Sequence, residues 1–263
     1  MHLLPRKVKS LLRVFGVDVS AFGIAIRNVR PLVGDYLEFR KQQKVSDQVF
    51  DSTKFYPCLA DRFQSAGTAS GHYFFQDLLV AQKIFKNCPE KHVDVGSRID
   101  GFVTHVAAFR EIEVFDVRPV VSKVPNVRFT RVDLMEEALI PDAYCDSISS
   151  LHAVEHFGLG RYGDAVHYEG HIIGLKNIYR MLKPGGKFYF SVPFGSQRIE
   201  FNSQRVFSMS YLMGMLGDRF AIDSFCYVND EGALESDVEL TPDTISNNLN
   251  CDYGCAIFEL SKI

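Results

Sequence analysis

The chain has 263 residues, of which 46% are hydrophobic and 23% charged, and its formal net charge is -3 at pH 7. This composition is ordinary for a globular protein, and the charge gives no general reason to expect nucleic acid as a partner. No apolar run is long enough to span a bilayer, and the six cysteines form no Cys-x-x-Cys pair. We therefore expect a cytoplasmic protein with reduced thiols and no transmembrane segment.

Residues 1–66 predict a helical N-terminal extension without an alternating strand pattern. Apolar residues recur among basic ones with helical spacing over residues 4–15, which predicts a short amphipathic helix. These apolar residues are Leu4, Val8, Leu11, Leu12 and Phe15. Three roles stay open for this helix: a weak membrane-surface contact, docking on the main domain, or packing in a homodimer.

After this extension, a loop rich in glycine and serine, Ser65–Phe74, precedes a helix predicted over residues 75–85. From residue 92 onward, short β-rich runs alternate with helical ones, which predicts a mostly parallel sheet covered on both faces. The fold class is therefore α/β, with a Rossmann-like sheet of seven strands. The predicted helices are 101–109 and 165–182, and the predicted strands are His92–Gly96, Glu111–Val117, Val127–Leu134, Cys145–His152, Lys187–Pro193 and a closing antiparallel pair, 220–228 and 255–262.

Acidic residues accompany the first three predicted strands. Asp94 lies in the first strand, Asp116 ends the second, and Asp133 ends the third. Because parallel strands bring their carboxyl ends to one edge of a sheet, these carboxylates can serve one nucleoside ligand. The alternative is that each acid only caps the turn that follows it.

The turn after the first strand reads Gly96-Ser97-Arg98-Ile99-Asp100-Gly101, so the middle glycine of a dinucleotide-binding loop is missing. A dinucleotide needs close backbone approach to its pyrophosphate, and Arg98 stands where that approach would occur. S-adenosylmethionine carries no phosphate. The turn therefore favours a sulfonium nucleoside over NAD.

Five stretches together resemble class I S-adenosylmethionine-dependent methyltransferases over about residues 67–260. They are VDVGSRIDGF, VFDVRP, RVDL, SISSLHAVEHFG and LKNIYRMLKPGGKFYFSVP. The resemblance implies a methyltransferase domain over residues 67–263 with S-adenosylmethionine as cofactor. It is nearest to a subgroup associated with surface-glycan gene clusters.

The resemblance also implies roles for individual residues. Asp94 and Gly96 match the motif at the methionine end of the cofactor, and Asp116 matches the ribose-binding acid. Asp133 and Leu134 match the adenine-binding pair. Ser150 and Leu151 match the strand end beside the sulfonium.

The main departure from the family pattern is Ser97-Arg98, where a second glycine would stand. Arg98 either pairs with the carboxylate of the cofactor or forms a surface ion pair. In the family, the segment before the first strand often closes over the cofactor, which makes His72, Tyr73 and Phe74 candidates for a lid. The alternative for Tyr73 and Phe74 is packing in the core.

A cluster of histidines follows the fourth predicted strand. His152 and His156 are candidates for the general base, because imidazole titrates near neutral pH. Of the two we prefer His152, because it directly follows Ser150-Leu151, where the strand end of the family faces the methyl group, whereas His156 would orient the acceptor or brace the loop. His167 and His171 are spaced to share one face of a helix. No metal ligand is assigned, and a divalent metal that helps to bind substrate stays an open alternative.

We expect an enzyme that methylates a hydroxyl of a sugar, a glycan precursor or another small acceptor. One alternative is a non-catalytic subunit that keeps the methyltransferase fold as a scaffold. Another is a metal hydrolase, because His152-x-x-Glu155-His156 fits an H-x-x-E-H order. That motif requires both histidines on one long helix, whereas His152 is predicted at a strand end.

Overall fold

The computed structural model describes residues 15–16, 18–48, 50, 52–136 and 140–263. It divides the chain into two compact units, Met1–Thr68 and Ala69–Ile263. The amphipathic helix predicted over residues 4–15 lies outside the described residues, apart from Phe15. None of the helices in the described part is long and apolar enough to cross a membrane.

The first unit consists of one long helix and an extended segment that contacts it. The helix, α2, spans Val19–Gln43 and is followed by the short 3-10 helix η1, Asp61–Phe63. Asn28 Nδ2 donates a hydrogen bond of 2.7 Å to the carbonyl of Leu59, and Tyr36 packs edge to face against Phe55. These contacts hold the segment after the helix against α2.

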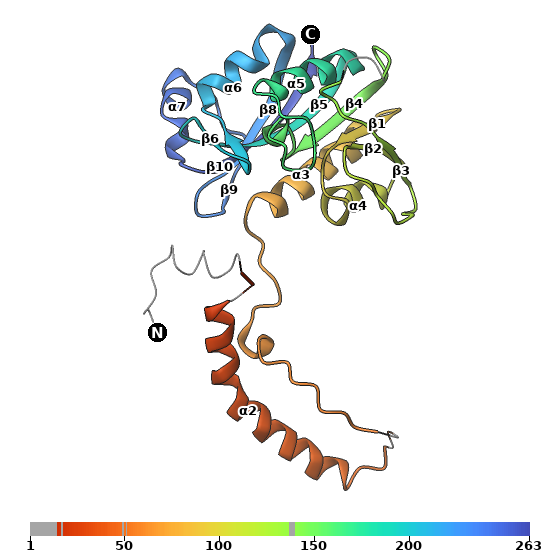
Figure 1. Cartoon of the computed structure of the whole chain (residues 1–263), viewed down its shortest axis with the longest axis vertical. Helices are drawn as coiled ribbons and strands as arrows, with labels where there is room; N and C mark the ends of the chain where they lie inside the picture. The colour runs from red at the N-terminus through yellow and green to blue at the C-terminus, as the bar shows by residue number, and fades with distance from the viewer. Residues whose placement is uncertain (1–14, 17, 49, 51, 137–139) are drawn as a thin grey trace. The chain divides into compact units, whose positions relative to one another are not determined.

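The second unit is built on an eight-stranded sheet with the order β3-β2-β1-β4-β5-β10-β8-β9 (Figure 1). The strands β1 to β5 run parallel, and β10 lies antiparallel between β5 and β8. The predicted antiparallel strand beside the fifth is confirmed, and the two-residue β9 is added to the seven expected strands. The strands are β1 His92–Val95, β2 Ile112–Asp116, β3 Val127–Arg131, β4 Cys145–Leu151, β5 Leu182–Phe194, β8 Phe220–Val228, β9 Leu234–Glu235 and β10 Gly254–Lys262.

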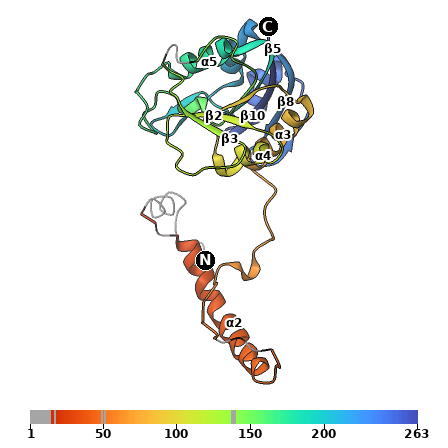
Figure 2. The same ribbon diagram turned by 90° about the vertical axis from the view of Figure 1, so that its right-hand side faces the viewer.

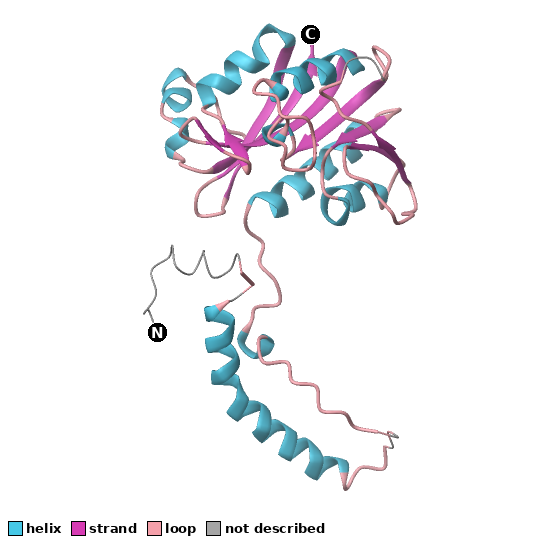
Figure 3. Ribbon diagram, viewed as in Figure 1, coloured by secondary structure: helices cyan, strands magenta, loops and turns pink. Residues whose placement is uncertain are grey.

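Helices cover both faces of this sheet (Figure 3). One hydrophobic cluster joins the sheet to α3 and α4, and a second joins it to α5 and α6. Figure 2 shows the strands between the layer that holds α5 and the layer that holds α3 and α4. The helices are α3 His72–Asn87, α4 Thr104–Ala107, α5 Gly170–Met181, α6 Met209–Leu216 and α7 Pro242–Ser246, and a small hairpin pairs β6 Arg198–Glu200 with β7 Gln204–Val206. Short helical turns are η2 Ile99–Val103, η3 Val154–His156, η4 Gly217–Arg219 and η5 Asn248–Asn250.

Local sequence explains why these elements form. In α3, Val80, Ala81 and Ile84 recur at helical spacing and are buried against the sheet. All four residues of β1 are buried, as expected for a parallel strand covered on both faces. The helix-to-strand alternation therefore brings the ends of β1 to β4 to one edge.

Several predicted boundaries are wrong by a few residues. β3 ends at Arg131, so Asp133 lies two residues beyond the strand rather than at its end. α5 begins at Gly170, so His167 precedes the helix. α3 begins at His72, inside the segment that was predicted as a loop. β5 begins at Leu182, and residues 183–186 fall in a register irregularity opposite β4.

Candidate active site

A cavity of about 450 Å³ lies where the segments after β1, β2, β3 and β4 meet. This is the edge of a parallel sheet at which ligands of α/β folds bind. Most of the predicted site residues line it, which are Gly96, Arg98, Asp116, Asp133, Leu134, Leu151, His152 and His156. Asp94 and Ser150 do not line the cavity and are fully buried beside it.

Asp94 holds the turn after β1 in place. Its carboxylate accepts hydrogen bonds from Ser97 N at 3.0 Å, Ser97 Oγ at 2.7 Å and Ser149 Oγ at 2.6 Å. Burial raises the pKa of Asp94 to about 7, although the hydrogen bonds from Ser149 and Ser97 favour the charged form. Asp94 therefore fixes the conformation of the turn through these hydrogen bonds.

Gly96 occupies a position that only glycine fits well. Its φ is +74°, and a Cβ there would lie 2.8 Å from the Cβ of Ala153. The turn can thus pass close to the segment after β4, which brings the ends of β1 and β4 together around the cavity.

Arg98 forms the exposed ion pair that was one of its two predicted alternatives. Its Nη2 lies 2.8 Å from Asp100 Oδ2, and both side chains are mostly exposed to solvent. The guanidinium also lies 5.8 Å from the ring centroid of Tyr73, which lines the same cavity. Such an exposed pair contributes little to stability, so Arg98 is free to exchange Asp100 for another anion.

Asp116 is engaged by Arg118 at the end of β2. The backbone N of Arg118 donates to Asp116 Oδ1 at 2.8 Å, and Arg118 Nε donates to the same oxygen at 2.9 Å. The Arg118 Nη2 also pairs with Asp116 Oδ2, at 2.5 Å. The Arg118 guanidinium lies over the Tyr162 ring at 4.4 Å. Asp116 thus presents an oriented carboxylate at the cavity wall.

Asp133 and Leu134 lie in the turn after β3. Asp133 Oδ1 accepts a hydrogen bond of 2.8 Å from Met135 N, so this acid does cap its turn. The Leu134 side chain is buried, and its carbonyl accepts from Asn177 Nδ2 at 2.8 Å. The turn is therefore fixed by contacts on both sides.

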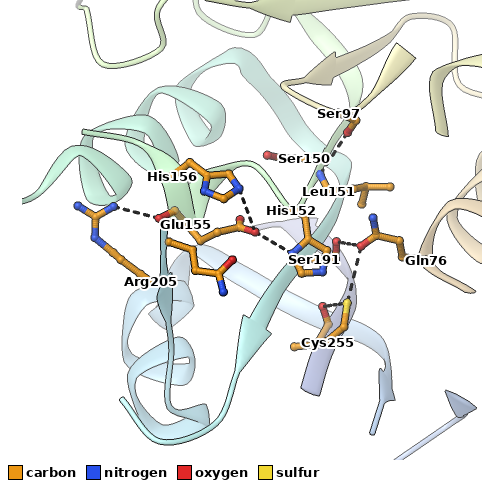
Figure 4. A network of polar contacts seen from close by, with 12 residues as sticks. Gln76, Ser97, Ser150, Leu151, His152, Glu155, His156, Ser191, Arg205 and Cys255 are labelled. Carbon is orange, nitrogen blue, oxygen red and sulfur yellow. Dashed lines mark hydrogen bonds and ion pairs between the residues drawn. The ribbon is translucent and has the colours of Figure 1, made fainter. Parts of the chain in front are cut away.

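Ser97 links the turn after β1 to the end of β4. Its Oγ accepts a hydrogen bond of 3.3 Å from the backbone N of Leu151 (Figure 4). The same Oγ donates to Asp94 Oδ1 at 2.7 Å. Ser150 Oγ donates to the carbonyl of Val95 at 3.2 Å, so this side chain joins the strands rather than facing the cavity.

His152 directly follows β4, in a left-handed conformation with φ of +50°. Its Nδ1 lies 2.7 Å from Glu155 Oε1, and the two side chains are 5% and 0% exposed (Figure 4). Burial disfavours the imidazolium, yet the Cys255 sulfur and the Glu155 carboxylate beside the ring raise the pKa of His152 above its ordinary value. His152 is therefore poorly suited to accept a proton in this state.

His156 has a different environment. Its Nδ1 lies 2.7 Å from the carbonyl of Ser203, which can only accept, so this nitrogen carries the proton. Nε2 is then the nitrogen that can accept a proton, and it lies 3.8 Å from Glu155 Oε1. Burial lowers the pKa of His156 and outweighs the opposing effect of Glu155. Of the two candidate histidines, His156 is the better proton acceptor.

Comparison with known proteins identifies the fold that carries this site. A family described as Caenorhabditis protein of unknown function, DUF268, matches residues 122–252. No curated protein matches the chain. A crystal structure provisionally assigned as a sarcosine dimethylglycine methyltransferase from Galdieria sulphuraria is similar with a TM-score of 0.50 and 12% identity, covering 71% of this chain and 85% of that one. The chain has the class I methyltransferase fold.

Two further structures are similar to the chain. One is the 1,6-didemethyltoxoflavin-N1-methyltransferase of Burkholderia thailandensis with 1,6-didemethyltoxoflavin and S-adenosylhomocysteine bound, at a TM-score of 0.49 and 16% identity over 71% of this chain and 78% of that one. The other is the [4+2]-cyclase SpnF, at a TM-score of 0.49 and 16% identity over 71% of this chain and 81% of that one. At such identities a likeness establishes the fold and not the reaction.

Of the three lid candidates, two line the cavity of this methyltransferase fold and one does not. His72 and Tyr73 line the cavity, while Phe74 does not. The Tyr73 side chain neighbours Arg98, and the His72 ring stacks on His152 with centroids 5.2 Å apart. The first turn of α3 is therefore part of the site.

The remaining histidine motifs do not form the predicted arrangements. His171 lies in α5 and contacts Tyr211, with Nε2 2.7 Å from the hydroxyl, whereas His167 lies outside that helix. Glu155 and His156 lie in the three-residue η3, so the long helix that an H-x-x-E-H hydrolase needs is missing from this stretch.

Sequence reasoning missed several residues of this site, among them Arg118, Tyr162, Tyr253 and Cys255. Arg118 directly follows the predicted acidic strand end and could have been found there. Tyr162 comes from the loop after η3, and Tyr253 and Cys255 come from the start of β10 and the residue before it, so they reach the site only through the fold. No local spacing points to them.

Proposed function

We propose that the protein is a cytoplasmic S-adenosylmethionine-dependent methyltransferase that acts on a hydroxyl of a sugar, a glycan precursor or another small acceptor. One observation carries the proposal: residues from the ends of β1, β2, β3 and β4 line a single cavity in a class I methyltransferase fold. Gly96, Asp116, Asp133 and Leu151 each come from a different strand end. Such convergence at one sheet edge is typical of a nucleoside site.

In this proposal, S-adenosylmethionine lies along the strand ends. Asp116 accepts the ribose hydroxyls, and the turn at Asp133 and Leu134 holds the adenine. The turn at Gly96, supported by Asp94, receives the amino-acid end of the cofactor. Arg98 can pair with its carboxylate because the ion pair with Asp100 is exposed.

The cofactor supplies the electrophile, so the chain has to position the acceptor and remove its proton. We assign the proton to His156, whose Nε2 can accept it and lies 3.8 Å from the Glu155 carboxylate, which would stabilise the resulting imidazolium. The oxygen lone pair of the acceptor forms the new bond to the methyl carbon while the bond from that carbon to sulfur breaks. The sulfonium becomes a neutral thioether, and the hydroxyl proton passes to His156.

The rim of the cavity suits an acceptor with several hydroxyl groups. Its polar side chains include Arg161, Asp164, Gln204 and Tyr253. Gln204 Nε2 donates to the Tyr253 hydroxyl at 2.8 Å, so two of these groups are already oriented. A few oriented polar groups around an otherwise apolar site give a small-molecule pocket its specificity. This rim supports a sugar over an apolar acceptor.

Calorimetric titration tests the cofactor first. S-adenosylhomocysteine should bind saturably, and NAD should not bind. No heat with S-adenosylhomocysteine would overturn the proposal. A second step follows radiolabelled methyl transfer in a single turnover with monosaccharides, nucleotide sugars and glycan fragments.

The alternative of a non-catalytic scaffold predicts a different result in the cofactor titration and the methyl-transfer assay. It predicts cofactor binding without transfer to any hydroxyl acceptor. Transfer to an amine or thiol, but not to a hydroxyl, would leave the methyltransferase assignment intact and overturn the hydroxyl assignment.

A further inference from the structure

Three potential metal ligands meet at one wall of the cavity. His72 comes from the first turn of α3, His152 from the end of β4, and Cys255 from β10. The ligand atoms of these three side chains lie within 4.8 Å of one another. We propose that His72, His152 and Cys255 bind a zinc ion whose fourth position faces the cavity.

The surroundings of His152 match those of a metal-bound histidine. Ligating histidines usually donate their second ring N–H to a carboxylate, which fixes the tautomer and orients the ring. His152 Nδ1 has such a partner in the fully buried Glu155, at 2.7 Å. The other nitrogen, Nε2, is buried, makes no well-formed hydrogen bond among the described residues, and belongs to a ring that lies beside the Cys255 sulfur. Figure 4 shows the ring between Glu155 and Cys255.

A buried nitrogen without a partner is costly, because it loses its hydrogen bonds to water and gains none in exchange. The side chain of His152 is 5% exposed, so bulk water does not satisfy it. A cation bound by Nε2, His72 and Cys255 would give this nitrogen the partner that it lacks.

The donor set selects the kind of ion. Two imidazole nitrogens and one sulfur are soft to intermediate ligands, which suit Zn²⁺ better than Mg²⁺ or Ca²⁺. Tetrahedral zinc with its usual bond lengths needs ligand atoms roughly 3.3–3.6 Å apart. The three ligand atoms lie within 4.8 Å of one another, so they must move closer together to bind zinc. His72 is only half-buried, and its ring can turn toward the site.

Three protein ligands with one open position are the pattern of catalytic zinc sites. His72 and His152 line the cavity, whereas Cys255 is fully buried behind them. The open position therefore faces the space where the acceptor would bind. This step rests on the proposed function: zinc would bind the acceptor oxygen and make its proton easier to remove.

Metal binding can be measured without any acceptor. The full chain is stripped with a chelator, and zinc is titrated in competition with a chromophoric chelator. Cobalt(II) is the second probe, because a thiolate ligand gives a charge-transfer band in the near ultraviolet. We expect about one tightly bound zinc per chain and a cobalt spectrum that includes this band.

Variants separate the proposed ligands from other histidines and cysteines. His72→Ala and Cys255→Ala should each weaken zinc binding by at least about tenfold, and Cys255→Ala should abolish the charge-transfer band. Glu155→Gln should weaken binding by roughly 10-fold to 100-fold through the orientation of His152. The matched controls are His105→Ala, at an exposed position of α4, and Cys226→Ala, buried in β8, and both should bind zinc normally.

Circular dichroism establishes which variants fold. If Cys255→Ala does not fold, His72→Ala alone tests the proposed metal ligands. The proposal is overturned if the wild type retains no zinc against a weak chelator, or if folded His72→Ala binds as tightly as the wild type. Titration of zinc-free protein with S-adenosylhomocysteine keeps the two proposals apart. Cofactor binding without zinc binding refutes only the metal site, and the reverse result refutes only the proposed function.

Discussion

Replacing Asp116 gives the sharpest test of the cofactor site, because its contacts with Arg118 allow the loss of S-adenosylhomocysteine affinity to be calculated approximately. The ribose of S-adenosylhomocysteine would donate two hydrogen bonds to the carboxylate, each contributing about 1.5–3 kcal/mol. In the free protein Asp116 already accepts from Arg118 Nε and Nη2, and these bonds must loosen when the ribose binds.

The net effect is therefore smaller than the sum of two new bonds. The Arg118 side chain is 40% exposed, so water can replace much of what its guanidinium gives up, at a cost of about 0–1 kcal/mol. The backbone N–H of Arg118 can keep its bond to Oδ1. We expect Asp116→Ala to weaken binding by at least about 2 kcal/mol, which is roughly 30-fold or more.

Isothermal titration with S-adenosylhomocysteine measures this change. Glu113→Ala is the matched control, because Glu113 lies on the same strand and contacts Lys91 and Tyr144 outside the cavity. It should leave the affinity unchanged within about twofold. A folded Asp116→Ala protein with wild-type affinity would refute the ribose assignment.

Three further predictions concern the turn, the base and the buried acid. Gly96→Ala should destabilise the fold by roughly 1–3 kcal/mol in urea denaturation, because of its φ of +74° and the contact with Ala153. The control is Gly214→Ala in α6, where nothing lies within contact of the added Cβ, and this variant should be more stable than the wild type by about 0.5–1 kcal/mol. His156→Gln should lower single-turnover methyl transfer by roughly 10²-fold to 10⁴-fold and leave S-adenosylhomocysteine affinity unchanged, while equal rates in the two proteins would exclude His156 as the base. Because the pKa of Asp94 is raised to about 7, its contribution to stability is full below its unfolded pKa of 3.8 and is lost as pH rises through 7. The wild type should therefore lose up to about 4 kcal/mol relative to Asp94→Asn between about pH 4 and pH 8, and parallel stability curves would contradict this.

The sheet could be predicted from sequence because its signals are local. β1 is a short, fully buried strand bounded by turn residues, and β3 alternates apolar with polar residues. β10 begins with five buried residues and alternates only after Phe258. Acids near the ends of β1, β2 and β3 also gave the position of the site, since parallel strands must bring their ends to one edge. Boundaries were less certain, as the early end of β3 before Asp133 shows.

The detailed chemistry of the site could not be predicted in the same way. Whether His152 or His156 accepts a proton depends on Glu155, Ser203 and Cys255, of which only Glu155 is near in sequence. The pKa of a buried group is set by its neighbours in space, and these come from other elements. Asp94 is a second example, because its complete burial and its hydrogen bond from Ser149 of β4 depend on how the strands pack against each other.

The two proposals together divide the work between the two histidines. A histidine that ligates a metal through Nε2 and donates Nδ1–H to a carboxylate has no nitrogen left to accept a proton. His152 is held in that manner by Glu155, so the zinc proposal removes it as a base. His156 lies one short helical turn away and keeps Nε2 as an acceptor because Ser203 binds the other nitrogen. The same segment after β4 can then present one side chain that binds the acceptor through a metal and another that takes its proton.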